Sequence, residues 1–101
     1  MHYLSTRNNQ LKESFLNILF RGLSKDGGLF LPSEWPTVSL ENLQGKSYQE
    51  VAHSIIYPYI EDDIPYSDLQ LIINKAYEIF DHKKIAPLLN LDQNKYILEL
   101  F

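Results

Sequence analysis

Cysteine is absent from this chain of 101 residues, and basic residues are few. Without cysteine the chain forms neither disulfides nor thiolate metal sites, a composition that fits the reducing cytosol. Lysines and arginines number 9 against 13 aspartates and glutamates, the net charge is -4, and Lys83-Lys84 is the only adjacent basic pair. Because nucleic-acid binding depends on clustered positive charge, we expect no nucleic-acid partner.

Long apolar runs are also missing. The opening segment from Met1 to Arg7 becomes polar too early for a signal peptide, and no later stretch approaches the roughly 20 apolar residues that cross a membrane. We therefore expect a soluble, cytoplasmic protein without a membrane partner. The hydrophobic content of 45% suffices for one core and the length is too short for two, so residues 1–101 are predicted to form one domain.

Helix signals lie in four places. Ser14 can cap a helix that runs to Arg21, and because this segment is apolar nearly all round, we expect it to be buried on most sides. Ser47 begins the strongest signal, since Glu50 completes a capping box ahead of a continuous apolar face, and Pro58 predicts a kink or stop near Tyr57. Residues 67–80 repeat the helical spacing, and residues 39–45 have the cap and stop of a single-turn connector.

Strand signals are shorter. Asp26-Gly27-Gly28 predicts a turn, followed by a short buried strand, Leu29-Phe30-Leu31, that Pro32 closes. Residues 85–91 and 95–101 are two extended runs about Asp92-Gln93-Asn94, which predicts a hairpin. The sequence therefore predicts an α+β fold: a small, mainly helical domain with a few short strands, including a C-terminal hairpin.

The apolar ending from Ile97 to Phe101 is unusual, because natural termini are mostly polar and frayed. From this ending we expect the chain to be a fragment or a trimmed form of a longer protein. We also expect exposed apolar surface around Leu98, Leu100, Phe101 and part of the first helix, where further domains would dock.

Candidates for chemistry are few. None of the 3 histidines pairs with another at metal-ligand spacing, and His53 lies beside an apolar stripe, where a partly packed edge histidine is the favoured interpretation. Glu61-Asp62-Asp63 fits a solvated helix end better than a cation site. Asp26-Gly27-Gly28 fits a turn better than a phosphate cradle, because it lacks the strand-to-helix context. From residues alone we predict no metal site and no catalytic group.

Short motifs nevertheless run along the whole chain. The opening Tyr3-Leu4-Ser5-Thr6-Arg7 is followed by Gly22-Leu23 and by Asp26-Gly27-Gly28-Leu29-Phe30-Leu31-Pro32. The later motifs are Ser47-Tyr48-x-Glu50-x-Ala52, Asp63-Ile64-Pro65, Ala76-Tyr77, Phe80, Ala86-Pro87-Leu88 and Leu98-Glu99-Leu100-Phe101. In this order they resemble the N-terminal domain of threonine synthases of the longer bacterial and fungal type. One departure is Asn8, which stands where that family usually has glycine.

The resemblance implies a pyridoxal 5'-phosphate (PLP) enzyme that converts O-phospho-L-homoserine and water to L-threonine and phosphate. In the family, Leu-Glu-Leu-Phe is followed by His-Gly-Pro-Thr and by Phe-Lys-Asp, whose lysine carries PLP. Residues 1–101 would thus end before that lysine, so no catalytic or cofactor-binding residue is carried over. We expect this segment to be inactive alone, to pack against the missing PLP-binding domains, and to meet a small-molecule substrate only in the full enzyme.

Arg7 is the one residue considered for a substrate contact, since a guanidinium binds phosphate or carboxylate. The favoured alternative is a structural salt bridge or a hydrogen bond to a loop carbonyl. Two other functions stay open: a free-standing binding or regulatory module that kept this fold, and a threonine-synthase-like phospho-lyase. The next codons of the gene would separate enzyme from module.

Overall fold

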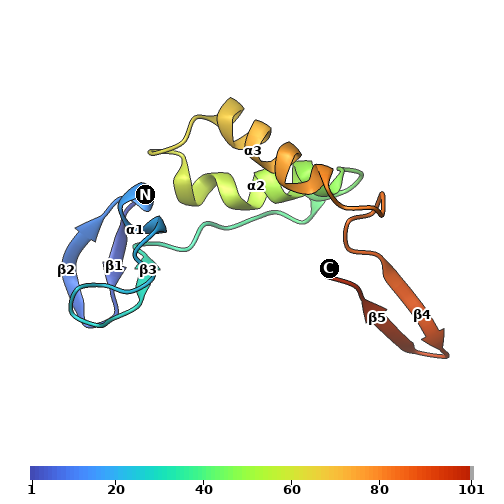
Figure 1. Ribbon diagram of the computed structural model, residues 1–101, viewed down its shortest axis with the longest axis horizontal. Coiled ribbons are helices and arrows are strands. Elements are labelled where there is room, and N and C mark those ends of the chain that lie inside the picture. The colour runs from blue at the N-terminus through green and yellow to red at the C-terminus, as the bar shows by residue number, and fades with distance from the viewer. Residues whose placement is uncertain (101) are drawn as a thin grey trace.

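A computed structural model describes residues 1–100, and Phe101 lies outside the described part. The chain is elongated, with extents of 49 × 32 × 28 Å. Figure 1 shows three parts in a row: a small sheet near the N-terminus, a pair of helices in the middle, and a separate hairpin toward the C-terminus. The predicted α+β class with a C-terminal hairpin is confirmed.

The N-terminal sheet contains β1 (Tyr3–Ser5), β2 (Asn8–Glu13) and β3 (Phe30–Pro32). Its order is β2-β1-β3, all neighbours are antiparallel, and the β1–β2 register shifts after Leu4. In this sheet only β3 corresponds to a predicted strand, one residue later than predicted, and its expected burial is wrong because Leu31 is 43% exposed. Since β3 is an edge strand, it accommodates Pro32 without losing a hydrogen bond of the ladder. The polar residues of β2 carry little strand preference, so its pairing with β1 determines its conformation.

The short helix α1 (Phe15–Leu19) begins as predicted, because Ser14 accepts a hydrogen bond from the backbone N–H of Asn17. The expected burial is wrong. None of its residues is buried, and Phe20 at its end is 94% exposed. The helix is apolar, as its sequence shows, but no other element of residues 1–100 covers its outer side.

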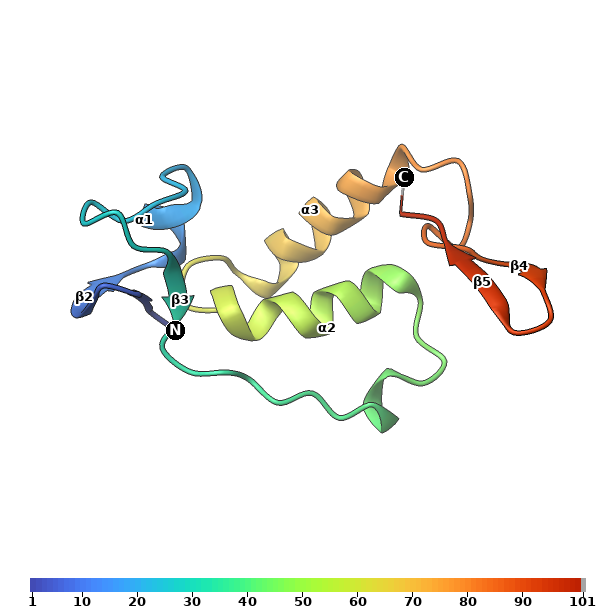
Figure 2. The ribbon, with the colours of Figure 1, turned by 90° about the horizontal axis from the view of Figure 1, so that it is seen from below.

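A connector leads from β3 through the 3-10 turn η1 (Glu41–Leu43) to the helix pair, and Figure 2 shows it running beside α2. Helix α2 (Tyr48–Ile60) begins with the predicted capping box, in which Ser47 and Glu50 exchange hydrogen bonds. Of the kink or stop predicted near Tyr57, the stop is wrong, because α2 continues through Pro58 to Ile60; the kink stays a prediction. Pro58 removes one internal hydrogen bond and crowds the preceding turn, and the burial of Ile60 in the core holds the helical turn beyond it.

Helix α3 (Tyr66–Glu78) returns along α2 and forms the core with it. Ile60 of α2 packs with Leu69 and Ile73 of α3, which leaves each of these side chains at most 4% exposed. Six partly buried residues surround this cluster: Phe15, Ala52, Tyr57, Tyr59, Ile64 and Tyr77. The core is therefore small and centred on the end of the helix pair nearest the sheet.

The C-terminal hairpin joins β4 (Leu88–Asp92) to β5 (Lys95–Leu98) and turns at Asn94, whose φ of 63° is left-handed. The hairpin was predicted, but its first strand begins at Leu88 and not at residue 85. Ile85 also has a left-handed φ, 62°, which is strained for a β-branched residue, and its burial holds it there. The predicted second run reaches Phe101, which lies outside the described residues.

Contacts between distant residues attach the sheet to the helix pair. The Tyr3 hydroxyl donates a hydrogen bond of 2.9 Å to the Tyr59 carbonyl in the last turn of α2. Asp63, in the loop between α2 and α3, accepts from the backbone N–H of Phe15 at 2.9 Å, and Asp62 pairs with the terminal ammonium of Met1. One side chain from β1 and two from the helical loop thus hold the two parts together. No helix in residues 1–100 has the length and apolar character needed to cross a membrane.

Replacing Tyr3 by Phe removes the hydroxyl that joins the sheet to α2, and we expect a loss of about 0.5–1.5 kcal/mol in the free energy of unfolding. Burial, and then the neighbouring Tyr59 and Asp63, raise the pKa of Tyr3 above its ordinary value of 10.0. A raised pKa in the folded state stabilises the fold below pH 10, and this stabilisation disappears as the pH rises further. Urea unfolding of the wild type and of Tyr3→Phe between pH 7 and 11 measures both the loss in stability and its dependence on pH. Tyr96→Phe, on the exposed hairpin, is the control and should change little.

Candidate functional site

Arg7 lies in the turn between β1 and β2, facing the loop of residues 24–28. Its Nη1 donates a hydrogen bond of 3.1 Å to the backbone carbonyl of Asp26. This is a contact with a loop carbonyl, as in the favoured structural interpretation. It uses one of the five N–H donors of the guanidinium, and within residues 1–100 Arg7 forms no ion pair.

The Asp26 carboxylate faces Ser5 and the Gly28 backbone. The Ser5 hydroxyl donates to it, with distances of 2.8 and 2.9 Å to the two carboxylate oxygens. The Gly28 backbone N–H donates to Oδ1 at 2.9 Å. The Gly28 bond, and then the Ser5 bond, hold the pKa of Asp26 below its ordinary value. The carboxylate of this loop is therefore already hydrogen-bonded by Ser5 and Gly28.

The two glycines permit this close approach. A Cβ atom on Gly28 would lie 2.2 Å from Ser5 Oγ and 3.1 Å from the Arg7 backbone nitrogen. Gly27 has a left-handed φ of 77°, and a Cβ there would lie 2.9 Å from Arg7 Nη1. The Gly27 N–H donates to the Ser24 carbonyl, and the Gly28 N–H is held by Asp26. The predicted turn is confirmed, and neither glycine N–H is available to cradle a phosphate.

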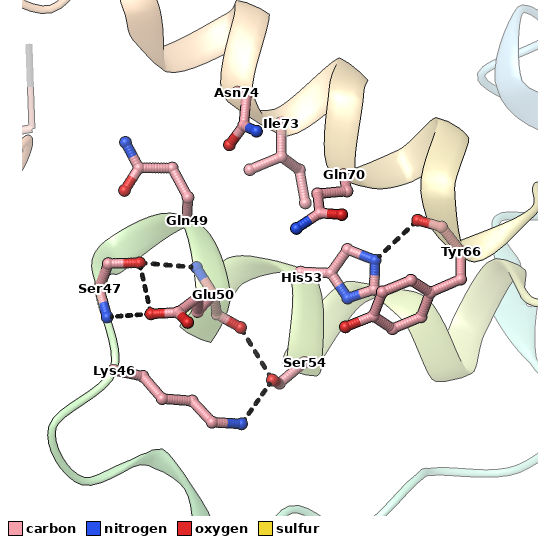
Figure 3. Close-up of a pocket in the computed structure, with 10 residues that line it drawn as sticks. All are labelled: Lys46, Ser47, Gln49, Glu50, His53, Ser54, Tyr66, Gln70, Ile73 and Asn74. Atoms are coloured by element: carbon pink, nitrogen blue, oxygen red, sulfur yellow. Dashed lines mark hydrogen bonds between the residues drawn. The ribbon is translucent and has the colours of Figure 1, made fainter.

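A second region is a cavity between α2 and α3, which sequence analysis did not predict. Its volume is about 220 Å³. Figure 3 shows Lys46, Glu50 and His53 on the side of α2, with Gln70, Ile73 and Asn74 projecting from α3. The helical spacing of Gln70, Ile73 and Asn74 is a signal that such residues share a face. Nothing in the sequence indicates that the facing helix leaves a space there.

His53 forms one wall of this cavity and is only 5% exposed. Its Nε2 lies 3.1 Å from the Tyr66 carbonyl oxygen, and its ring is stacked on Tyr57 and tilted against Tyr66, with centroid distances of 5.4 and 3.9 Å. The packing interpretation of His53 is confirmed, although the ring is more buried than an edge position suggests. Since a carbonyl only accepts, Nε2 carries a hydrogen, and in the neutral ring Nδ1 is an acceptor.

The charged residues of the cavity lie near the start of α2. Glu50 Oε2 accepts from both the backbone N–H and the hydroxyl of Ser47 at 2.7 Å. These bonds, the backbone one first, lower the pKa of Glu50, and Lys46 adds to the effect. Lys46 Nζ donates to the Ser54 hydroxyl at 3.3 Å, and that hydroxyl donates to the Glu50 carbonyl at 2.8 Å.

The remaining candidates have structural partners. Asp62 and Asp63, considered for a cation, contact the terminal ammonium and the Phe15 N–H. No cluster of three metal-ligating side chains occurs in residues 1–100. Every lysine is exposed to solvent: Lys12, Lys25, Lys46, Lys75, Lys83, Lys84 and Lys95.

The close contact at Gly28 gives a direct test of the loop. Because Gly28→Ala would place a methyl group against Ser5, we expect the free energy of unfolding to fall by about 1–3 kcal/mol. Gly45→Ala is the comparison for backbone strain without a clash: alanine adopts the left-handed φ of 74° there only with strain, but a Cβ meets nothing within 4 Å. Thermal and urea unfolding should show a larger loss for Gly28→Ala. A larger loss of stability for Gly45→Ala would mean that the loop of residues 24–28 shifts to accommodate a methyl group at position 28.

Known proteins share this arrangement. The family described as "Threonine synthase N terminus" matches residues 2–77. Threonine synthase from Pseudomonas aeruginosa is 36% identical, and the alignment covers 100% of this chain and 22% of that protein. Threonine synthase-like 2 from Xenopus laevis is 33% identical, and the alignment covers the same shares of the two chains. The crystal structure of PLP-bound threonine synthase from Brucella melitensis superposes with a TM-score of 0.91 at 40% identity, over 100% of this chain and 22% of that one. The chain thus spans about a fifth of the length of these relatives, and it belongs to the threonine synthase N-terminal family.

Proposed function

We propose that residues 1–101 are the N-terminal structural domain of a cytoplasmic, PLP-dependent threonine synthase. The full enzyme would convert O-phospho-L-homoserine and water to L-threonine and phosphate. The similarity in sequence and fold supports this, because it extends over the whole chain and over only 22% of the relatives. The chain's own role would be to pack against the domains that hold the cofactor and substrate.

The exposed apolar surface is the observation that carries this proposal. The accessible surface is 7960 Å², whereas a compact monomer of this mass exposes about 5,900 Å². The radius of gyration is 16.9 Å, against about 13 Å for a compact domain of 100 residues. Large apolar side chains are exposed on every part of the chain, including Phe20, Trp35, Leu71, Ile79, Leu98 and Leu100. Such a surface is typical of a chain that is covered by other domains.

The residues of this chain do not fit PLP themselves. A PLP site requires a lysine for the Schiff base and donors for the phosphate. The lysines here are all exposed, and the N–H groups of the glycine pair are already bound. We therefore derive no catalytic step from this chain and propose that alone it neither binds PLP nor turns over substrate. A stoichiometric imine absorbance on mixing the chain with PLP would contradict this.

Two alternatives keep the same fold. A free-standing binding or regulatory module would have to function with its apolar surface uncovered, which the large accessible area disfavours. A threonine-synthase-like phospho-lyase fits this chain as well as a threonine synthase does, since the Xenopus laevis relative is 33% identical over the same span. Because the residues that would select the substrate lie outside this chain in that proposal, assays of the full enzyme with different phosphorylated substrates separate the two.

Arg7→Ala in the full-length enzyme separates a structural role from a substrate contact. The hydrogen bond to the Asp26 carbonyl would be lost, so we expect a drop of about 0.5–1.5 kcal/mol in stability, with KM nearly unchanged. Lys25→Ala, which removes an exposed basic residue of the same loop, is the control for charge. Unchanged melting with a KM raised more than tenfold would instead assign Arg7 to the substrate phosphate or carboxylate.

Hydrogen exchange tests the docking that the proposed function requires. Amides of β5 should exchange rapidly in this chain alone, where the strand pairs only with β4, and slowly in the full enzyme. Amides in the middle of α2 are the internal control, because their helical hydrogen bonds exist in both forms. Strong, equal protection of β5 in both would favour the free-standing module.

A further inference from the structure

The C-terminal hairpin of β4 and β5 stands apart from the core of the chain. Both ribbon views show it beyond the helix pair, joined to α3 by the loop of residues 79–87 (Figure 1 and Figure 2). Every residue of β4 and β5 is exposed, and within residues 1–100 neither strand belongs to the core cluster or to the partly buried residues around it. Because a two-stranded hairpin alone is at best marginally stable in water, this hairpin lacks the packing that would hold it in place.

Both faces of the hairpin are apolar at its open end. Leu88 pairs with Leu98 across the two strands. The next pair is Leu89 with Ile97. Since successive side chains of a strand alternate between its faces, the two pairs lie on opposite faces, and all four side chains are 42–60% exposed. A strand pair with one face in water alternates apolar and polar residues, so apolar pairs on both faces are typical of strands inside a protein.

The threonine synthase N-terminal family ends before this hairpin. Its match covers residues 2–77, which include the sheet and nearly all of the helix pair but neither β4 nor β5. Similarity to threonine synthases nevertheless continues over 100% of the chain, which covers only 22% of those relatives. Because the matched family is the N-terminal one, the larger part of such a protein would follow the hairpin. Domain boundaries lie where few contacts cross, as they do between α3 and β4.

We propose that the part of the full-length chain after residue 101 takes up the β4–β5 hairpin as a piece of its own sheet. A strand of that part pairs with a free edge of the hairpin, and apolar side chains cover both hairpin faces. The polar turn from Asp92 to Lys95 stays in water. The inference rests on the proposed function, because it requires the longer chain, and it adds how the two parts are joined.

A second copy of the chain does not fit the hairpin as well. Two hairpins that pair edge to edge satisfy the backbone groups of one edge each, but such pairing leaves both apolar faces of each hairpin exposed. The occupant has to cover two faces and an edge together, and a large domain that continues directly from β5 can do so.

Hydroxyl-radical footprinting of the full-length protein tests this arrangement, because it measures the exposure of individual side chains. Leu88 and Leu98 report on one face, and Leu89 and Ile97 report on the other. We expect oxidation of all four side chains to fall to the level of the buried α2–α3 core. Oxidation of either pair well above that level would mean that the hairpin lies on the surface, and would overturn the proposal. Protection that disappears on dilution would assign the occupant to a second copy, with the same consequence.

Substitutions on the two faces give an independent measurement. Ile97→Gln and Leu98→Gln place a carboxamide on opposite faces, and each should lower the melting temperature of the full-length protein by about 2–4 °C, because the burial of an apolar side chain is lost. Lys95→Gln, beside the turn, is the control and should leave the melting temperature unchanged. A fall for only one of the two face variants would indicate that the other face lies in water, which contradicts the proposal.

Neither measurement depends on enzymatic activity, so the inference and the proposed function can fail separately. Protected faces in a full-length protein without threonine synthase activity would contradict the proposed function and support the inference. An active threonine synthase in which one hairpin face is exposed would overturn the inference alone.

Discussion

The Asp26 carboxylate ties the end of strand β1 to the loop before β3, and so fixes one end of the strand that carries the Tyr3 contact with the helices. Ser5 ends the central strand β1, and its hydroxyl binds Asp26, which also holds the backbone at Gly28 just before β3. At the other end of the same strand, Tyr3 donates to the last turn of α2. A short three-residue strand is therefore fixed at both ends, by the loop on one side and by the helix pair on the other.

Local signals explain what could be predicted from the sequence. The capping box of Ser47 and Glu50, the Ser14 cap and the turn at Asp26–Gly28 each depend on residues within four positions of one another. Their hydrogen bonds form in nearly any surroundings, so the sequence pattern alone identifies them. The hairpin belongs to the same group, because its two strands are joined by a short turn. The position of Arg7 beside a loop carbonyl also agrees with its favoured interpretation, although its part in a complete enzyme stays a prediction.

Contacts between distant residues explain what could not be predicted. Strand β2 is polar and forms because β1 pairs with it, and α2 continues through Pro58 because Ile60, beyond the proline, is buried against Leu69 and Ile73 of α3. The left-handed Ile85, which delays the start of β4, is held by burial and not by its own preference. The cavity beside His53 depends on how two helices approach each other, and no spacing within either helix describes that. The expected burial of α1 failed for a related reason, since an apolar helix indicates that a partner exists but not where it lies.

The contact between Tyr3 and Tyr59 spans 56 residues, and this separation imposes an order on folding during synthesis. The α2–α3 pair is built from neighbouring segments and can form as soon as both helices have left the ribosome. The first strand emerges much earlier, but its anchor on α2 has not yet been made. At 5–20 residues per second the delay is roughly 3–11 seconds. For that interval Tyr3 and Phe15 remain without their helical neighbours, so these aromatic side chains stay uncovered until the segment of α2 has been synthesised.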